Sequence, residues 1–547
     1  MTEKTLFRSP QSRKKLLFSS LFCLVLVGGS LPAEAVPGRI LSTTKTPGAA
    51  ATGAAWDGTH LWVADHRNET LYRVDVKSGR TINKLLSPGH RPGDLAWDGK
   101  YLWSASPRER KIYKVDTSTG FVLHRISTHA TTPNGLAWER GGLWTVDSAT
   151  NALRKLDPDD GTTMRKLPAP SENISGLTWD GRYLWAADRI ADLIYLVDIQ
   201  FGDVIFSIPA PGPHVTGLAH DGRRLFAVDY GENMIYAMVS ESRKRVSRKR
   251  VKTLNMEYRY QIRNQGPAPL QDLDFYLAVP VRELSHHMRT PPRYFSKPTG
   301  YVTDEWGQRF AHFQFKNVEA GKPVTVGWRT TVDLYDVRHF VFPHTILPER
   351  RIPVKIRKAY LGDATKYSIN DPAIKKAVEE AVGEETNLYW RARRIYRYVH
   401  QRMYYKLGGG WNAAPYLLEK GSGSCSEYSF LFIAMCRVAG IPARYVGSFV
   451  VRYDDASFDQ VFHRWVEIYL PGYGWLPVDP SRGDKPTEAE RGDAFHRLTP
   501  DFLITTRSGG PSRYLGWKYN SNSEWRCKGR CKVTRDRIAE WTPYKAD

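Results

Sequence analysis

The stretch Gly421-Ser-Gly-Ser-Cys425-Ser-Glu-Tyr428 decides the fold of the C-terminal part of this 547-residue chain. A Gly/Ser turn precedes Cys425, and the segment 426–439 is apolar enough for a buried helix that Gly440 ends. Three further segments follow in the order Gly440-Ile-Pro-Ala-Arg444, His463-Arg-Trp465 and Asp479-Pro480. Together they supply a thiol, an imidazole and a carboxylate, the three groups with which thiol enzymes attack an amide carbonyl.

His463 and Asp479 lie on two strand-like runs, 462–470 and 475–478, which a loop containing two glycines joins as a hairpin. The two side chains share a face of the hairpin only if the register pairs residues whose numbers have an even sum. A symmetric four-residue loop would pair Leu470 with Trp475 and would turn Asp479 to the wrong face. We therefore expect a three- or five-residue loop, or a bulge, in this hairpin.

These motifs resemble the transglutaminase-like superfamily, a papain-related fold with G-x-C before a helix, G-I-P-A-R on the next strand, then H-x-W and D-P. The resemblance covers about residues 365–485 and implies a catalytic triad of Cys425, His463 and Asp479. It also implies a second oxyanion donor upstream of the cysteine, for which Trp411 and Asn412 are candidates beside the Cys425 backbone N–H.

Two influences on the Cys425 thiol oppose each other in the sequence. The helix N-terminus and an imidazolium favour the thiolate, whereas Glu427 in the first helical turn works against it. Taken alone, each motif also has a structural explanation, because a cysteine at a helix start is often a small buried side chain, as we expect for Cys436. The sequence therefore leaves two hypotheses: a thiol enzyme, and a binding protein in which the cysteine domain is structural.

As an enzyme, the chain would act on peptide or carboxamide bonds through a Cys425 thioester. Hydrolysis, as in a protease or amidase, is favoured over protein cross-linking, because water is always present and cross-linking needs a site that excludes it. The substrate class expected is a protein or peptide, and we expect no metal or cofactor.

From Gly53 to Val239 the sequence repeats with a period of 41 residues, marked by Trp56, Trp97, Trp138, Trp179 and His220. Short alternating strands between Gly and Asp turns at this period are typical of β-propeller blades. Residues 38–48 match the opening strand of later repeats, and the fifth repeat lacks that strand. We therefore predict a five-bladed β-propeller over 36–240, closed by the N-terminal strand and similar to lactonase-like propellers. The recurring Asp residues fit a structural role in turns.

The rest of the chain divides into three parts. Residues 1–35 combine a basic start, an apolar run and small residues before Val36, the pattern of a secretory signal peptide. Apolar and polar residues alternate along segments of 241–345, which predicts a β-sandwich. Residues 346–547 are assigned to an α+β catalytic domain with a C-terminal extension. Export to the periplasm, the cell envelope or the medium would allow a disulfide between Cys527 and Cys531.

Positive charge is concentrated after the repeats: residues 241–547 carry +18 of the formal net charge of +22. The basic run Arg243–Lys252 could bind anionic cell-envelope polymers, or it could be a linker or edge strand kept soluble by its charge. We expect no specific nucleic-acid partner. No run after the signal reaches about 18 apolar residues, so we expect no membrane span in the mature chain.

Overall fold

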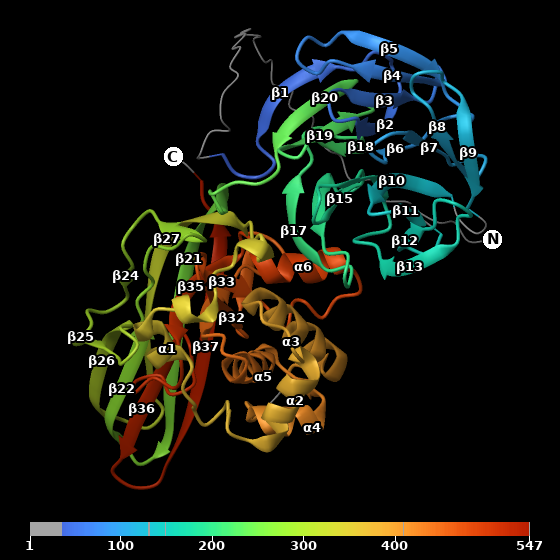
Figure 1. Ribbon diagram of the computed structural model, residues 1–547. Helices are drawn as coiled ribbons and strands as arrows, with labels where there is room; N and C mark the ends of the chain where they lie inside the picture. Colours follow the sequence, from blue (N-terminus) through green and yellow to red (C-terminus); the bar gives the residue numbers. More distant parts are fainter. Residues whose placement is uncertain (1–34, 129–131, 148, 409, 546–547) are drawn as a thin grey trace, which may run out of the picture.

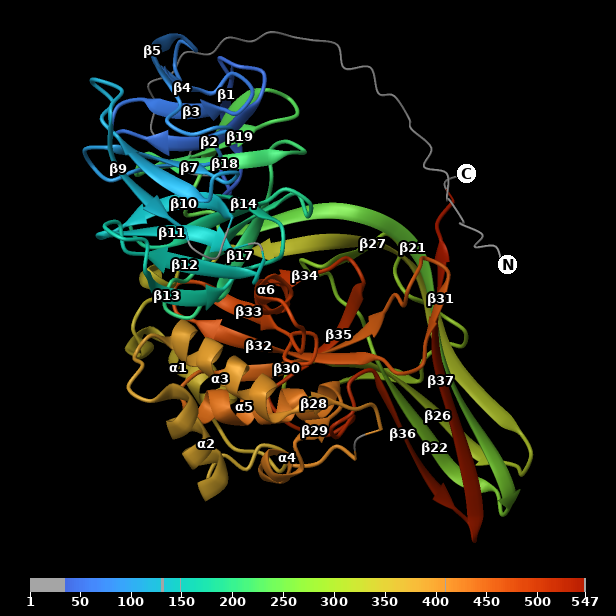
Figure 2. The same cartoon turned by 90° about the vertical axis from the view of Figure 1, so that its right-hand side faces the viewer.

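The computed structural model describes residues 35–128, 132–147, 149–408 and 410–545 (Figures 1 and 2). The expected signal peptide lies outside the described residues, apart from Ala35. In the described part, no helix combines the length and the apolar composition needed to cross a membrane. The chain is mostly strand, and its α-helices all fall within 354–496 of the described residues.

Residues 40–239 form five four-stranded antiparallel sheets, as many as the sequence has repeats (Figure 1). The first four sheets contain β2 (Ala51–Trp56), β3 (Leu61–Asp65), β4 (Thr70–Val74) and β5 (Thr81–Leu86); β6 (Leu95–Trp97), β7 (Leu102–Ser106), β8 (Lys111–Val115) and β9 (Val122–Ser127); β10 (Pro133–Glu139), β11 (Gly142–Asp147), β12 (Ala152–Leu156) and β13 (Thr163–Pro168); and β14 (Ile174–Trp179), β15 (Leu184–Asp188), β16 (Leu193–Val197) and β17 (Val204–Pro209). The fifth contains β18 (Val215–His220), β19 (Arg224–Asp229), β20 (Met234–Val239) and β1 (Ile40–Lys45). The expected pairing of the N-terminal strand with the fifth repeat is confirmed, because β1 pairs with β20.

The first strands of the five sheets contact one another in a cycle, β2 to β6, β10, β14, β18 and back to β2. Glycine at one repeat position permits this approach: a Cβ on Gly53 would lie 2.5 Å from the Asp94 Cα. Asp94 takes the place of that glycine in the second repeat. Its buried carboxylate accepts backbone N–H bonds from Ala54, Leu136 and Leu177, which belong to three different sheets, at 3.1, 2.8 and 3.0 Å. Burial raises the pKa of Asp94 to about 8, although these bonds act to lower it.

The recurring Asp residues take part in contacts inside each repeat. The fully buried indole of Trp62 donates its N–H to Asp57 at 3.0 Å, and Trp103 donates to Asp98 at the same distance. Asp57 also accepts the backbone N–H groups of Thr59 and His60 in the following turn. These carboxylates therefore join a tight turn to a buried tryptophan, which is the structural role that the repeat pattern predicts.

Two further antiparallel sheets pack face to face after the repeats (Figure 2). One contains β23 (His286–Met288), β24 (Arg293–Tyr294), β27 (Pro323–His339), β21 (Val246–Pro267), β37 (Cys531–Pro543), β31 (Ser457–Asp459) and β34 (Arg497–Leu498); the other contains β25 (Gly300–Thr303), β26 (Arg309–Val318), β22 (Leu270–Ala278) and β36 (Ser521–Cys527). Buried hydroxyl pairs join the two sheets, since Tyr258 contacts Ser521 at 2.5 Å and Tyr260 contacts Ser523 at 2.6 Å.

The C-terminal extension differs from the boundary that the sequence suggests. The sequence groups it with the catalytic domain, yet β36 pairs with β22 and β37 pairs with β21 along most of their lengths. The physical reason is that β21 and β22 each have one side unpaired by the 241–345 segment, and an unpaired strand edge must be covered. The expected disulfide, Cys527–Cys531, closes the loop between these two C-terminal strands.

Part of the basic run Arg243–Lys252 makes contacts within the protein, while Arg243, Lys244, Lys249 and Arg250 are exposed. From Val246 onward it belongs to β21 and pairs with β27. Lys252 forms ion pairs with Asp455 at 3.0 Å and Asp501 at 3.3 Å. The Arg248 guanidinium lies over the Tyr335 ring, 3.3 Å from its centroid. The run is therefore a strand of the sheet and not a free linker.

The α+β region holds the sheet β33 (Gly474–Val478), β32 (His463–Leu470), β30 (Ala443–Val450) and β35 (Phe502–Ser508). Its helices are α1 (Val354–Tyr360), α2 (Pro372–Val382), α3 (Leu388–Arg402), α4 (Ala414–Lys420), α5 (Cys425–Val438) and α6 (Glu488–His496), with 3-10 turns η1 (Pro343–Thr345) and η2 (Glu349–Arg351). Two short strands, β28 (Tyr404–Tyr405) and β29 (Ser422–Gly423), pair in parallel beside the start of α5. The buried helix α5 contacts β30, β32, α2, α3 and α4.

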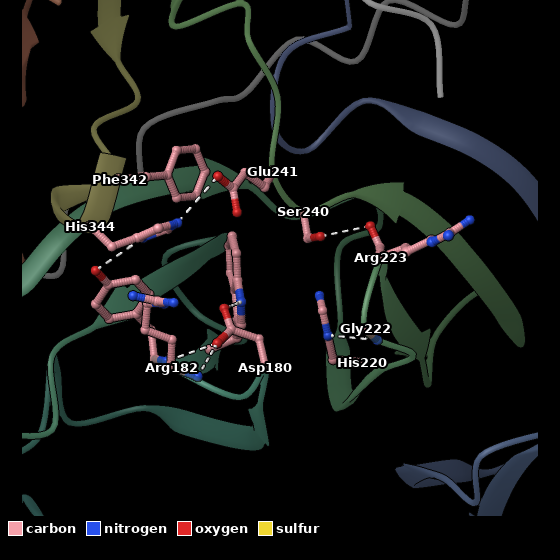
Figure 3. A pocket seen from close by; sticks show the side chains of 11 residues that line it. Asp180, Arg182, His220, Gly222, Arg223, Ser240, Glu241, Phe342 and His344 are labelled. Carbon is pink, nitrogen blue, oxygen red and sulfur yellow. Dashed lines mark hydrogen bonds and ion pairs between the residues drawn. The ribbon is translucent and has the colours of Figure 1, made fainter. Parts of the chain in front are cut away.

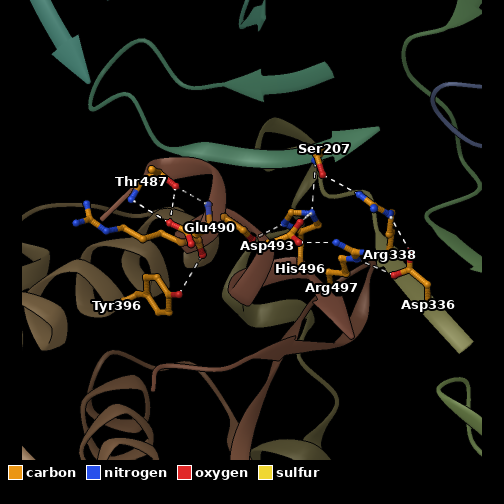
Figure 4. Close-up of polar contacts among 11 residues, drawn as sticks. Ser207, Asp336, Arg338, Tyr396, Thr487, Glu490, Asp493, His496 and Arg497 are labelled. Atoms are coloured by element: carbon orange, nitrogen blue, oxygen red, sulfur yellow. Dashed lines mark hydrogen bonds and ion pairs between the residues drawn. The ribbon is translucent and has the colours of Figure 1, made fainter. Parts of the chain in front are cut away.

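Helix α6 joins this region to the repeats, because it packs against both β17 and β33. Figure 4 shows Arg338 and His496 directed at Ser207 of β17. Arg338 donates to the Ser207 hydroxyl at 2.8 Å, and the Ser207 backbone N–H donates to His496 at 3.4 Å. Nearby, Asp203 pairs with the buried Arg393 of α3 at 3.1 Å. The interface thus combines buried polar contacts with apolar packing of Phe206 against Phe340 and Phe342.

Candidate active site

Cys425 is the first residue of α5, and it is only 4% exposed. Gly421 ends the preceding helix α4 in the left-handed conformation, with φ of 66°, which the absence of a side chain permits. Gly423 leaves room for Glu427, since a Cβ there would lie 2.6 Å from the Glu427 Cβ. The Gly/Ser turn therefore places the thiol at the N-terminus of a buried helix.

The hairpin that carries His463 and Asp479 has the even register that the sequence analysis requires. Leu470 pairs with Gly474 across a three-residue loop, and Val466 pairs with Val478. The expectation of a three- or five-residue loop is confirmed. His463 and Asp479 consequently lie on one face, where His463 Nε2 is 2.6 Å from Asp479 Oδ2.

Asp479 is held firmly in this orientation. Its other carboxylate oxygen accepts the Ser481 hydroxyl at 2.9 Å and the Arg482 backbone N–H at 3.0 Å. Its own backbone N–H donates to Ala494 of α6 at 2.7 Å. The helix that packs on the repeats thus also fixes the residue that orients His463.

The structure brings Cys425 and His463 close enough for each to shift the pKa of the other. Because Nε2 of His463 faces Asp479, the other ring nitrogen, Nδ1, is the one left for the thiol. Burial raises the pKa of the Cys425 thiol, but the bond and charge of His463 and the N–H of Arg464 lower it below its usual value. Burial acts to lower the pKa of His463, yet Asp479 and Cys425 together raise it to about 10. These shifts favour a thiolate–imidazolium pair.

Glu427 caps the helix. Its fully buried carboxylate accepts the backbone N–H of Ser424 at 2.9 Å and the side-chain amide of Asn412 at 2.8 Å. The Asn412 amide, a candidate oxyanion donor from the sequence, is therefore bound to Glu427. Cys436, on the same helix, is fully buried, and burial raises its thiol pKa well above the usual value.

Arg464 is a residue whose place the sequence did not reveal. Its side chain is fully buried, and its guanidinium lies among the rings of Tyr445, Tyr519, Phe430 and Trp411, at 4.4, 4.5, 4.9 and 5.3 Å from their centroids. It donates to the Trp517 carbonyl oxygen, and within the described residues it has no ion pair with a carboxylate. Its charge helps to lower the pKa of Cys425. No local signal marks a strand arginine as buried.

Tyr405 is a second residue that the sequence analysis missed. Burial raises the pKa of Tyr405, and the nearby backbone N–H of Cys425, the expected first oxyanion donor, acts to lower it. Tyr405 lies on β28, next to β29 and the turn before Cys425. The Tyr405 hydroxyl is therefore close to the expected oxyanion donor, whereas the Trp411 ring covers Arg464.

Comparison with known proteins agrees with this arrangement. Residues 375–480, which include all three side chains, match the family model of the transglutaminase-like superfamily. They form a transglutaminase-like domain. Residues 33–148 match a family described as a repeat of unknown function (DUF6923).

Two curated relatives match part of the chain. The protein-glutamine gamma-glutamyltransferase of Pseudomonas aeruginosa is 31% identical over 151 residues, covering 24% of this chain and 22% of that protein. An uncharacterized protein of Haemophilus influenzae is 27% identical over 151 residues, covering 23% of this chain and 41% of that protein. The chain thus spans less than half the length of each relative. Family model and relatives support a thiol enzyme at the level of the superfamily.

Among solved structures, the glutaminyl cyclase of Myxococcus xanthus has a TM-score of 0.34 and 17% identity, covering 37% of this chain and 94% of that one.

A separate cavity of about 510 Å³ lies between the fourth and fifth repeats and the segment around His344 (Figure 3). Some of its polar groups contact other side chains of the lining. Asp180 accepts the Trp185 indole N–H at 2.9 Å, and Glu241 pairs with His344 at 3.4 Å. None of the three triad candidates lines this cavity.

Proposed function

We propose that this protein is an exported thiol enzyme that cleaves peptide or carboxamide bonds through a thioester on Cys425. The observation that carries the proposal is His463 lying between Cys425 and Asp479, with 2.6 Å between Nε2 and the Asp479 carboxylate. This geometry supports the catalytic roles proposed for the three residues.

The reaction has two steps. The Cys425 thiolate attacks the carbonyl carbon, the C–N bond breaks, and the His463 imidazolium gives its proton to the departing amine. The backbone N–H of Cys425 donates to the oxyanion, and the Tyr405 hydroxyl donates beside it once it has rotated toward the substrate oxygen. Water then attacks the thioester, losing a proton to His463, and the carboxylic acid and the thiolate are released.

A second candidate is transfer of the acyl group to an amine, which forms a cross-link. The similarity to a protein-glutamine gamma-glutamyltransferase over 151 residues favours it. The two candidates share the thioester and differ in the second step alone. We place hydrolysis first, because a cross-linking site must keep water from the thioester.

We further propose that residues 36–240 are a five-bladed propeller that serves as a binding platform. The support is the cycle of contacts among the first strands of the five sheets and the closing strand β1. A non-catalytic chain, in which the propeller alone binds a ligand, is the rival hypothesis. Export is proposed from the pattern of residues 1–35.

Single-turnover acylation with a glutamine-containing peptide and with a reactive ester tests the proposal. We expect one acyl group on Cys425, found by peptide mass mapping, and none in Cys425→Ala. Cys436→Ser is the matched control and keeps full acylation. Acylation that persists in Cys425→Ala would refute the mechanism. Release by water compared with release by a primary amine decides between hydrolase and cross-linking enzyme.

A further inference from the structure

A cavity of about 690 Å³ opens against Trp411, next to the candidate active site. Two indoles and three cations stand out in its lining: Trp411, Trp517, Lys366, Arg513 and Lys518. Glu524 is the carboxylate among its lining residues. The cavity therefore combines flat apolar surface with an excess of positive charge.

The walls of this cavity are built on the residues that surround the thiol. The Trp411 ring lies 6.4 Å from the Tyr519 ring, and both rings cover the guanidinium of Arg464. The Trp517 ring packs 5.2 Å from Phe430, which follows Cys425 on α5. Cys425 also acts electrostatically on the neighbouring Tyr519. The cavity therefore shares packing partners with the candidate active site, although none of the three triad candidates lines it.

The two lysines donate hydrogen bonds to neutral acceptors. The ammonium of Lys366 donates to the Trp411 carbonyl oxygen, and that of Lys518 donates to the Asn522 side chain. Within the described residues, neither lysine forms an ion pair, whereas Arg513 pairs with Glu305 at 3.3 Å. Burial lowers the pKa of Lys518, the cations Arg535 and Arg537 lower it further, and Glu524 acts to raise it. An anion placed between these side chains would relieve that repulsion.

We propose that this cavity is a subsite for an acidic segment of the peptide substrate, with its carboxylates between Lys366 and Lys518 and its apolar atoms on Trp411 and Trp517. A peptide fits better than a phosphate polymer, because the two indoles offer surface that a polyphosphate has no apolar atoms to cover. The inference rests on the proposed function for the link to Cys425. Binding at the subsite does not require the chemistry.

The test measures binding in the full chain carrying Cys425→Ala, so that no acyl group is transferred. The probe is a fluorescein-labelled peptide Ala-Glu-Glu-Gln-Glu-Ala, compared by fluorescence anisotropy with a peptide in which Gln replaces each Glu. We expect the acidic peptide to bind at least fivefold more tightly at low salt, and the preference to shrink as salt is added. Adding Lys518→Gln should weaken its binding about fivefold.

Lys84→Gln, an identical change at an exposed site on β5, is the matched control and should leave the affinity unchanged. Lys366→Gln provides a second variant if Lys518→Gln alters the thermal midpoint. Equal affinity for both peptides, or equal effects of Lys518→Gln and Lys84→Gln, would overturn the subsite. The subsite would also be overturned if inorganic polyphosphate bound tightly and in a Lys518-dependent way while the acidic peptide bound no more tightly than its Gln-substituted counterpart. A confirmed preference in a wild-type protein that never acylates would uphold the subsite and reject the enzyme.

Discussion

Replacing Asp479 with Asn removes one charge from the buried trio and keeps the shape of the side chain. In the structure, Asp479 lies 2.6 Å from His463 and is the main partner that raises the imidazole pKa to about 10, against the effect of burial. Without the carboxylate, burial lowers that pKa, and the imidazole is neutral at neutral pH. The thiol then loses the cation that stabilises its ionised form.

The size of the effect follows from the thiolate fraction. A cysteine with the ordinary pKa of about 8.5 is only about 0.3% ionised at pH 6. Wild-type Cys425, with its lowered pKa, should be more ionised than this at pH 6 and should react faster with iodoacetamide. We therefore expect Asp479→Asn to shift the midpoint of the pH profile upward and to slow alkylation at pH 6, with a ceiling of about 300-fold set by the ratio of a fully ionised thiol to an ordinary one.

The assay follows alkylation of the Cys425 peptide by mass spectrometry from about pH 4 to about pH 10, a range that includes the ordinary thiol pKa and values well below it. Cys436 is an internal control, since burial holds its thiol protonated. Asp501→Asn is the matched variant, because that carboxylate pairs with Lys252 and not with an imidazole. If wild type and Asp479→Asn share one profile with a midpoint of about 8.5, the three side chains do not act as a unit and the triad assignment fails.

Three other predictions concern residues that the structure singles out. Arg464→Met should raise the alkylation midpoint of Cys425 with little loss of stability, because no carboxylate in the described part of the chain pairs with this buried cation; an unchanged midpoint would contradict its electrostatic role. Tyr405→Phe should slow acylation about 10- to 100-fold by removing a donor at the oxyanion position, whereas Tyr428→Phe, whose hydroxyl donates to Asp484 at 3.1 Å, should not. Asp94 has a folded-state pKa of about 8, against the ordinary aspartate value of 3.8, so the folded state holds its proton more strongly. Unfolding free energy should thus fall as pH rises from about 4 to about 8, and urea titrations of Asp94→Asn should show a flatter dependence.

The sequence by itself determined the features that depend on local pattern. A constant spacing of 41 residues predicts five similar units. The structure has five four-stranded sheets, and β1 supplies the fourth strand of the fifth sheet. The parity of residue numbers across a short hairpin constrains the face of His463 and Asp479, and the three-residue loop agrees with it. Both inferences succeed because strand alternation and turn length act over a few residues.

Tertiary structure alone decided which distant side chains meet. The pairing of β36 with β22 and of β37 with β21 joins residues more than 200 positions apart, and no periodic pattern in the sequence predicts it. The burial of Arg464 depends on four rings from four different segments. Tyr405 reaches Cys425 because β28 pairs with β29. Such contacts reflect the packing of whole elements, in which the free energy of burying a side chain is shared among partners that the local sequence does not specify.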